Sequence, residues 1–140
     1  MKKGITFSTF DLFHAGHVLM LKEAKSQCDW LIVCLQTDPT VDRPNKNKPV
    51  QTLFERFIQV TACKYVDELL VYTTEDELIQ ILKATDYDVR IIGEEYADKS
   101  FTGNDYCQDK LYFNKRKHSF STTELRDRII DYNKSRLLTN

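Results

Sequence analysis

The sequence predicts one doubly wound α/β domain with a five-stranded parallel sheet. Segments with strand character alternate with segments of helical periodicity along the chain, and this alternation is typical of a parallel sheet covered by helices on both faces. Residues 30–35 (WLIVCL) form a continuous apolar run, as expected for a central strand that is buried on both sides. A chain of 140 residues with 41% hydrophobic content also has the size of one domain.

Each element has a local signal of its own. Residues 5–8 are rich in β-formers, and residues 17–26 place apolar side chains at helical spacing among good helix formers. Thr52, followed by Glu55, is a capping-box pattern at a helix start. We expect strands at 5–8, 30–35, 66–72, 89–93 and 111–113, and helices at 17–26, 52–63, 75–83 and 121–132. This order describes a Rossmann-like domain over residues 1–132, followed by a C-terminal tail over 133–140.

The charge balance excludes two classes of partner. Twenty basic and twenty-one acidic residues give a net charge of −1, so no global field recruits nucleic acid or an anionic membrane surface. We expect neither a signal peptide nor a membrane span, because polar residues break the first apolar stretch, and we expect a cytoplasmic protein. Four widely spaced cysteines fit reduced, buried thiols better than a metal site: Cys28, Cys34, Cys63 and Cys107.

All three prolines of the chain fall within one long polar stretch, residues 37–49. Such a composition cannot build a core element and marks a surface loop. The loop follows the expected central strand and carries Lys46 and Lys48. Because long loops in compact domains are commonly functional, both lysines are candidates for binding an anionic ligand.

Two of the three histidines lie in a single tetrapeptide, His14-Ala15-Gly16-His17, between the first expected strand and the first expected helix. A lone histidine is most often a hydrogen-bonded structural residue. A pair at i and i+3, however, shares one helical face, and open α/β sheets bind ligands outside the carboxyl ends of their strands. We therefore expect both rings to face one ligand group at this edge of the sheet.

A second polar cluster precedes the last helix. Lys115-Arg116-Lys117-His118 leads into Ser121-Thr122-Thr123, and a helix N-terminus with hydroxyls and preceding cations suits a phosphate group. The alternative is an ordinary capped helix behind solvated basic residues. Together with the histidines and the loop lysines, this cluster is able to surround a triphosphate and stabilise the charge of a phosphorus transition state. Neither a P-loop nor a Gly-x-Gly-x-x-Gly motif occurs in the sequence.

Two motifs carry a family resemblance. Thr9-Phe10-Asp11-x-x-His14-x-Gly16-His17 and Phe120-Ser121-Thr122-Thr123 resemble the HxGH nucleotidyltransferase superfamily of cytidylyltransferases and adenylyltransferases. Within it the chain is most similar to the small bacterial glycerol-3-phosphate cytidylyltransferases, from Lys2 to about Ile129. The resemblance implies that a phosphate or phosphonate oxygen of a small acceptor attacks the α-phosphorus of a nucleotide and that pyrophosphate is released.

The same resemblance assigns roles to individual residues. It implies that His14, His17, Lys46 and Arg116 are catalytic, with Lys48 a close competitor of Lys46. It implies a nucleotide site made of the two histidines and a further set: Thr9, Phe10, Asp11, Gly93, Arg116, Ser121 and Thr122. Asp11 either fixes its loop or helps to hold the Mg²⁺ that accompanies the nucleotide. Contacts to the acceptor substrate fall to Lys48, Arg56, Lys64, Asp67 and Glu94.

Several functions fit these motifs. The resemblance favours a CTP-dependent enzyme that acts on a small phosphorylated alcohol, and it implies a homodimer. Adenylyl transfer to a heptose phosphate, or cytidylyl transfer to a phosphonate or an amino-alcohol phosphate, fits as well. A protein of another class, a catalytically silent nucleotide-binding module that regulates a partner, is the remaining alternative. The complete set of His14, His17, Lys46 and Arg116 argues against it.

Overall fold

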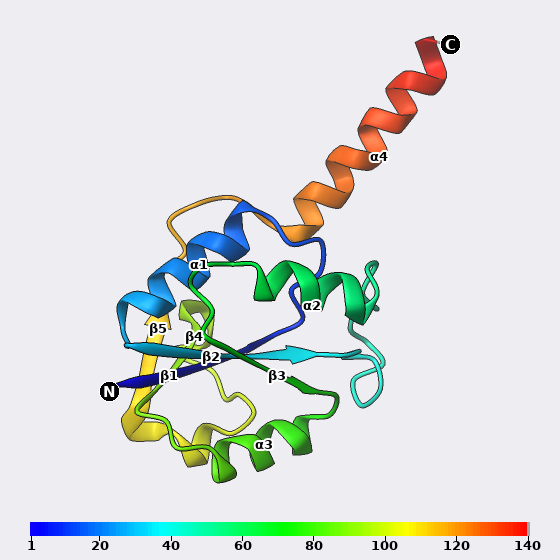
Figure 1. Ribbon diagram of the computed structural model, residues 1–140. Coiled ribbons are helices and arrows are strands. Elements are labelled where there is room, and N and C mark those ends of the chain that lie inside the picture. The colour runs from blue at the N-terminus through cyan, green and yellow to red at the C-terminus, as the bar shows by residue number, and fades with distance from the viewer. Residues whose placement is uncertain (140) are drawn as a thin grey trace.

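The computed structural model describes residues 1–139, which form a five-stranded parallel sheet with helices on both faces (Figure 1). The strand order is β3-β2-β1-β4-β5, and each neighbouring pair is parallel. The predicted Rossmann-like, doubly wound sheet is thereby confirmed. In chain order the elements are β1 (Lys3–Ser8), α1 (Ala15–Ser26), β2 (Trp30–Gln36), α2 (Leu53–Thr61), β3 (Glu68–Tyr72), α3 (Glu75–Ala84), β4 (Val89–Gly93), β5 (Leu111–Asn114) and α4 (Thr122–Thr139).

Two apolar cores cover the two faces of the sheet. α1 and α2 lie on one face, where Leu21, Ala24 and Val60 belong to one buried cluster. α3 lies on the opposite face, where Leu78 and Leu82 belong to the other. β2 is buried at every residue except its first, as its apolar run predicts. Because both faces are closed, the polar groups able to bind a ligand gather at the strand ends.

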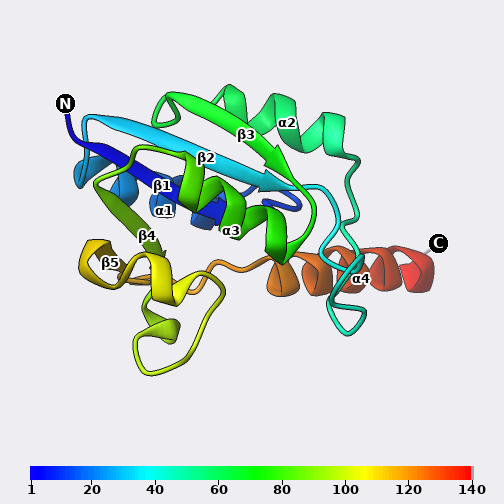
Figure 2. The same cartoon turned by 90° about the horizontal axis from the view of Figure 1, so that it is seen from below.

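The predicted elements are present, with one large error at the C-terminus. Most predicted boundaries differ from the observed ones by no more than two residues. The prediction that the last helix ends at Tyr132 is wrong, because α4 continues to Thr139 and projects away from the sheet (Figures 1 and 2). Residues 133–136 lack the apolar spacing of a core-facing helix, but lysine and arginine are good helix formers on an exposed one. No helix within residues 1–139 is long and apolar enough to cross a membrane.

The connection from β4 to β5 has structure that the sequence does not predict. Arg90 of β4 lies buried between the rings of Phe7 and Phe101, 5.1 and 5.3 Å from their centroids, and donates to the carbonyl oxygen of Thr102 at 2.7 Å. These contacts hold the middle of the connection, at Phe101 and Thr102, against the sheet. Along it lie three short 3₁₀ helices: Glu94–Tyr96, Asn104–Tyr106 and Gln108–Lys110.

The order of the strands determines where a ligand can bind. The chain leaves β1 towards β2 on one side, whereas β4 and β5 lie on the other side of β1. Such a reversal opens a crevice at the carboxyl ends of the strands, between β1 and β4. The segment after β1 leads into α1, and the segment after β5 leads into α4. Both motifs of the sequence are therefore brought to this crevice.

Candidate active site

A cavity of about 590 Å³ lies in the crevice between the carboxyl ends of β1 and β4. The first turn of α1 forms one wall, and the connection from β5 to α4 forms the other. The two walls are joined by a hydrogen bond between His14 and Thr122, which lie 108 positions apart in the sequence. Six predicted nucleotide-site residues line the cavity: His14, His17, Gly93, Arg116, Ser121 and Thr122.

The two histidines begin α1 by capping its first turn. His14 is the N-cap residue, and its Nδ1 accepts the N–H of Gly16 at 3.0 Å. His17 is the third helical residue, and its Nδ1 accepts the N–H of His14 at 3.1 Å. This is a capping box in which imidazoles replace the usual hydroxyl and carboxylate. The ring centroids lie 3.9 Å apart, so the cap, and not a shared helical face, brings the pair together.

The same hydrogen bonds determine where each ring carries its proton. A nitrogen that accepts a hydrogen bond bears no proton, so each neutral ring is protonated on Nε2. Nε2 of His14 lies 3.1 Å from Oγ1 of Thr122 and donates to it. That hydroxyl donates in turn to the carbonyl oxygen of Asp11 at 3.3 Å. The first residue of α4 therefore orients the ring at the start of α1.

Burial keeps both rings neutral. Desolvation, reinforced by the neighbouring His14 and opposed by the charge of Asp11, lowers the pKa of His17 to about 3. Burial also lowers the pKa of His14, and the nearby His118 and Arg116 lower it further. A neutral ring protonated on Nε2 and bonded through Nδ1 has one function left, that of an N–H donor, and in His14 this N–H is already donated to Thr122. Such donors stabilise negative charge that develops in the cavity.

Gly16 is required by the packing of the rings. A Cβ atom at this position would lie 2.8 Å from Cε1 and 3.0 Å from Nδ1 of His14, and 3.0 Å from Cε1 of His118. The ring of His14 is hydrogen-bonded at both nitrogens and cannot move without losing a bond. A side chain at position 16 therefore displaces the residue that caps α1.

The opposite wall of the cavity is a basic turn that leads into α4. Arg116 lines the cavity and donates from Nη2 to the carbonyl oxygen of Phe120 at 2.6 Å. Ser121 caps α4 by accepting one N–H of its first turn at 3.0 Å, and the remaining N–H groups of that turn have no partner within the helix. Glu23 ties the turn to α1, since its carboxylate accepts the N–H of Lys115 at 2.9 Å. Cationic and N–H groups thus converge on the cavity.

The loop after β1 borders a second, smaller hollow of about 180 Å³. Thr9, Phe10 and Asp11 line it, together with His17 and Thr122 from the main cavity. Phe10 has a φ of 51°, a conformation that costs a residue with a side chain of this size some strain. The predicted nucleotide-site residues therefore lie around two adjoining spaces that share His17.

Asp11 fixes the long loop. Its two carboxylate oxygens accept the N–H groups of Val50 at 2.9 Å and Gln51 at 3.0 Å. Of the two roles that the sequence left open for Asp11, fixing its loop or helping to hold Mg²⁺, these hydrogen bonds correspond to the first. Residues 1–139 contain no group of three or more His, Cys, Asp or Glu side chains placed to hold a metal ion. The donors present do not fit a Mg²⁺ held by the protein itself, so phosphate oxygens would have to supply most of its ligands.

The two loop lysines lie outside both cavities. Lys46 is exposed, and the amino group of Lys48 lies 3.9 Å from a carboxylate oxygen of Asp38. Their neighbours Asn47 and Pro49 do border the smaller hollow. The loop therefore borders the smaller hollow through Asn47 and Pro49, and the lysine side chains reach a phosphate there only if this segment moves.

Arg56 does not reach the cavity, which corrects the expectation that it binds the acceptor. It is 2% exposed. Its Nη1 donates to the carbonyl oxygens of Thr9 at 3.0 Å and Gln36 at 2.6 Å, Nη2 donates to Thr37 at 2.6 Å, and Nε donates to Gln51 at 3.2 Å. Its guanidinium therefore joins the segments that follow β1 and β2, and it stabilises the site without lining the cavity.

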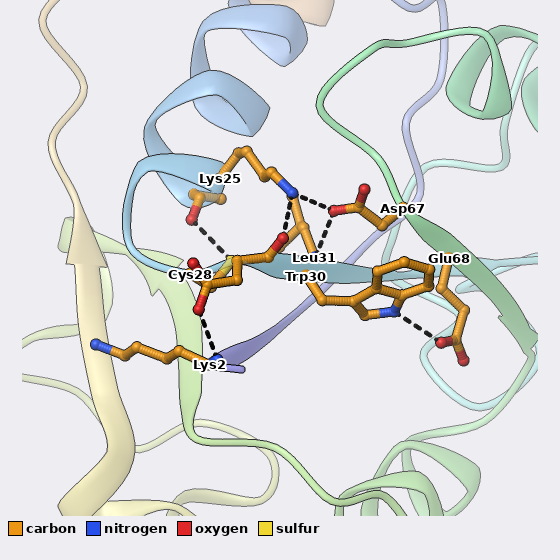
Figure 3. Close-up of polar contacts among 9 residues, drawn as sticks. Lys2, Lys25, Cys28, Trp30, Leu31, Asp67 and Glu68 are labelled. Carbon is orange, nitrogen blue, oxygen red and sulfur yellow. Dashed lines mark hydrogen bonds and ion pairs between the residues drawn. The ribbon is translucent and has the colours of Figure 1, made fainter.

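Lys64 and Asp67 also lie away from the cavity, because both precede β3 at the amino end of the sheet. Figure 3 shows Asp67 accepting the N–H of Leu31 at 2.8 Å and pairing with Lys25 near the end of α1. Burial opposes ionisation here, but the hydrogen bonds from Lys25 and Leu31 lower the pKa of Asp67. Asp67 joins α1, β2 and β3, so the expectation that it and Lys64 contact an acceptor in the cavity of their own chain is corrected.

Glu23, Tyr96 and Asn114 are among the polar or aromatic residues of the cavity that no sequence motif marks. Glu95, and not the predicted Glu94, lines the cavity, because the 3₁₀ turn after β4 brings its carboxylate over Gly93. No motif surrounds Glu23. Its one signal is a spacing of seven residues from Gly16, which is two helical turns along the same face.

Known proteins are similar to this chain in sequence and in fold. Residues 5–128 match the family model described as cytidylyltransferase-like. The chain is 30% identical to the glycerol-3-phosphate cytidylyltransferase of Bacillus subtilis, over 92% of this chain and 98% of the relative. It is 36% identical to the bifunctional protein HldE of Caulobacter vibrioides over 89% of this chain, and it spans 26% of that longer protein. A lipopolysaccharide core biosynthesis protein from Thermoplasma volcanium has the same fold, with a TM-score of 0.68 at 22% identity over 84% of this chain and 99% of the other.

A crevice with paired imidazoles and a basic helix N-terminus, on a sheet of this order, defines an enzyme of the nucleotidyltransferase class. Within that class the chain belongs to the cytidylyltransferase-like family. The match begins in β1 and ends within α4, so it includes both walls of the cavity.

Proposed function

We propose that the protein is a CTP:glycerol-3-phosphate cytidylyltransferase. A phosphate oxygen of the acceptor attacks the α-phosphorus of CTP and forms a new P–O bond. The bond from the α-phosphorus to the bridging oxygen breaks, and pyrophosphate leaves with that electron pair. The products are a CDP-alcohol and pyrophosphate. The observation that supports this proposal best is the pair of neutral, Nε2-protonated imidazoles at the cavity wall.

The geometry supports a role for these residues in this reaction. The acceptor phosphate is already anionic near neutral pH, so its attack needs no general base. What develops in the transition state is negative charge on the phosphoryl oxygens. The Nε2–H of His17, Arg116 and the N–H groups at the start of α4 are held in position by the fold, which is the condition for strong electrostatic stabilisation. The Nε2–H of His14 is donated to Thr122, so His14 joins these donors only by exchanging that hydrogen bond for one to the substrate. Lys46 joins them when its loop segment moves over the phosphates.

Magnesium enters the proposal as part of the nucleotide. Mg²⁺ binds most readily to phosphate oxygens and water, with one or two carboxylates at most. The charged and imidazole groups of the cavity lining are mostly cations and histidines, and the carboxylates among them are Glu23 and Glu95. We therefore assign the ion to the CTP complex and give it no ligand set on this chain.

A second acceptor and nucleotide pair stays in the proposal because of the relatives. The bifunctional HldE proteins are as similar to this chain as the glycerol-3-phosphate cytidylyltransferases are. Similarity therefore does not single out one substrate, and adenylyl transfer to a heptose phosphate, which the resemblance also allows, stays as the alternative. A relative from Encephalitozoon cuniculi, named as a probable ethanolamine-phosphate cytidylyltransferase, is 32% identical over 86% of this chain. An amino-alcohol phosphate is therefore a third acceptor class.

One assay separates these functions. Pyrophosphate release is measured with CTP and with ATP against glycerol 3-phosphate, ethanolamine phosphate, a heptose phosphate and a phosphonate. We expect the highest kcat/KM with CTP and glycerol 3-phosphate. A higher kcat/KM with ATP and the heptose phosphate would replace the proposal by its alternative. Release with no pair, together with tight nucleotide binding, would identify a non-catalytic nucleotide-binding module.

A further inference from the structure

The third histidine of the chain reaches the same crevice as the first two. His118 lies in the turn between β5 and α4, and it lines the larger cavity. Its Cε1 lies 3.0 Å from the point that a Cβ atom of residue 16 would occupy, and Cε1 of His14 lies 2.8 Å from the same point. The ring centroids of His14 and His17 are 3.9 Å apart. Three imidazoles therefore gather over the first turn of α1.

The ring of His118 is held in place by its own turn. Its Nδ1 accepts the N–H of Phe120 at 3.1 Å. The two rings also stack, with centroids 5.3 Å apart and an angle of 27° between their planes. Both contacts restrict the rotation of the His118 side chain. A side chain that is already restricted loses little conformational freedom when it binds a ligand.

The same hydrogen bond determines which nitrogen of His118 carries the proton. A nitrogen that accepts an N–H bears no proton, so the neutral ring is protonated on Nε2. The Nε2–H of His14 is donated to Thr122. By contrast, no group within residues 1–139 accepts a hydrogen bond from Nε2 of His118. His118 therefore offers a donor that the fold positions and does not use.

The surroundings of this donor suit an anion. Arg116 and Lys117 line the cavity beside His118. Two carboxylates belong to the cavity lining, all of which lies in the described part of the chain, and neither bonds to His118. Glu23 accepts its hydrogen bonds from β5 and from the start of the basic turn, and Glu95 lies over the end of β4. An acceptor for the Nε2–H of His118 must therefore come from a bound molecule.

We propose that His118 is a third imidazole donor of the nucleotide site and that its Nε2–H donates to a non-bridging oxygen of the α-phosphoryl group. This inference rests on the proposed function, which brings the α-phosphoryl group of CTP to the paired imidazoles. His17 borders both the larger cavity and the smaller hollow, whereas His118 borders the larger cavity of the two. The phosphoryl group is thereby contacted from α1 by His17 and from the opposite wall by His118.

The contact would act mainly on the transition state. The ring of His118 keeps its proton throughout, and its hydrogen bond strengthens as negative charge develops on the phosphoryl oxygen. This donor is ready in the unliganded fold, while His14 has first to give up its bond to Thr122. His118 is thus a catalytic residue in the sense that it touches the reacting group, and its loss should lower kcat more than nucleotide affinity.

Two substitutions separate the two nitrogens of the ring. The amide of His118→Asn reaches the position of Nδ1 and keeps an acceptor for the N–H of Phe120, whereas the amide of His118→Gln reaches the position of Nε2 and keeps a donor in the cavity. With the active nucleotide and acceptor pair, we expect kcat to fall about tenfold or more in His118→Asn. In His118→Gln it should stay within about threefold of the wild type. The dissociation constant of CTP, measured by calorimetry, should change far less than kcat in His118→Asn.

The opposite order of the two variants would overturn the proposal. If His118 served only to hold its turn, His118→Asn would keep its activity and His118→Gln would lose it. An unchanged kcat with a raised KM for the acceptor in His118→Asn would make His118 a ligand of the acceptor, which also overturns the proposal. Thermal unfolding of both variants serves as the control for the integrity of the turn and of α4.

A binding experiment tests the contact without turnover. In nuclear magnetic resonance spectra of the histidine ring nitrogens, the Nε2 signal of His118 is identified by its loss in His118→Asn. CTP with Mg²⁺ should shift this signal in the wild type, and cytidine, which has no phosphate, should not. A signal that CTP leaves unshifted, or that cytidine shifts equally, would overturn the proposal. A CTP-dependent shift in a wild type that releases no pyrophosphate with any acceptor would support the contact and contradict the proposed function alone.

Discussion

Nε2 of His14 lies 3.1 Å from Oγ1 of Thr122, and this hydrogen bond joins the start of α1 to the start of α4. The bond closes a chain of donors that runs from the N–H of Gly16 through the imidazole and the hydroxyl to the carbonyl oxygen of Asp11. Within this chain Thr122 is the member that decides the direction of His14. It therefore gives a sharp test of whether the orientation of the ring matters.

Thr122→Val removes the hydroxyl and keeps the shape of the side chain. Loss of one hydrogen bond that orients a reacting group costs about 1 kcal/mol or more, so we expect kcat to fall about tenfold. Thr122→Ser keeps the hydroxyl and should stay close to the wild type. Equal losses in the valine and serine variants would show that the methyl group, and not the hydroxyl, is what the site needs.

His17→Ala tests whether this ring acts on the transition state. Removal of one fixed donor to a developing charge typically lowers kcat by about 100-fold to 1000-fold. We expect a loss of this size in kcat and a much smaller change in the dissociation constant of CTP, measured by calorimetry. Equal losses in turnover and affinity would instead make His17 a ground-state ligand. Circular dichroism shows whether α1 survives the loss of its cap.

Arg56→Met should destabilise the fold and leave substrate recognition alone. The change leaves buried carbonyl oxygens of Thr9, Gln36 and Thr37 without their donor. We expect the free energy of unfolding in urea to fall by roughly 3–5 kcal/mol. Arg56→Lys restores charge but not the fork of donors, so it should recover only part of the loss. If Arg56→Met had the stability of the wild type and a raised KM for the acceptor, Arg56 would instead be a residue of the acceptor-binding site.

The stability of the protein should depend on pH through His17. The pKa of this ring is about 3 in the folded chain and 6.5 as its ordinary value, so between these values the unfolded chain binds more protons. The free energy of unfolding contributed by the neutral ring is therefore complete above about pH 6.5 and decreases as the pH falls towards 3. Urea unfolding across this range should show a weaker decrease for His17→Gln than for the wild type. Parallel curves for the two proteins would contradict this assignment.

The fold could be predicted because its signals are local. The apolar run of β2, the capping box of Thr52 with Glu55, and the acidic first turn of α3 each mark an element without reference to the rest of the chain. The end of α4 could not be predicted in this way. Apolar spacing marks a helix that packs on its own core, and α4 is exposed at every residue from 127 to 138.

The site could be predicted only in part, since its members come together through tertiary structure. The two histidines and the Ser121–Thr122 pair carry motifs and do line one cavity. A charged residue near a helix start, such as Arg56, is expected to be exposed. The carbonyl groups that accept its hydrogen bonds belong to segments distant in the sequence, so its burial has no local signal. Glu95 replaces Glu94 at the cavity because a 3₁₀ turn decides which carboxylate points inward. No propensity distinguishes two adjacent glutamates.

The crevice at which β1 and β4 separate is made by the order of the strands, and not by any side chain. Residues can therefore be exchanged around its rim without closing it, whereas Ile5, Leu31 and Ile91 beneath it must stay packed. On the proposed function, a new acceptor requires substitutions at the rim, in positions such as Glu95 and Tyr96. The proposed reaction centre at His14 and His17 stays in place meanwhile. This separation of scaffold from rim allows one backbone to acquire different substrates by a few mutations at a time.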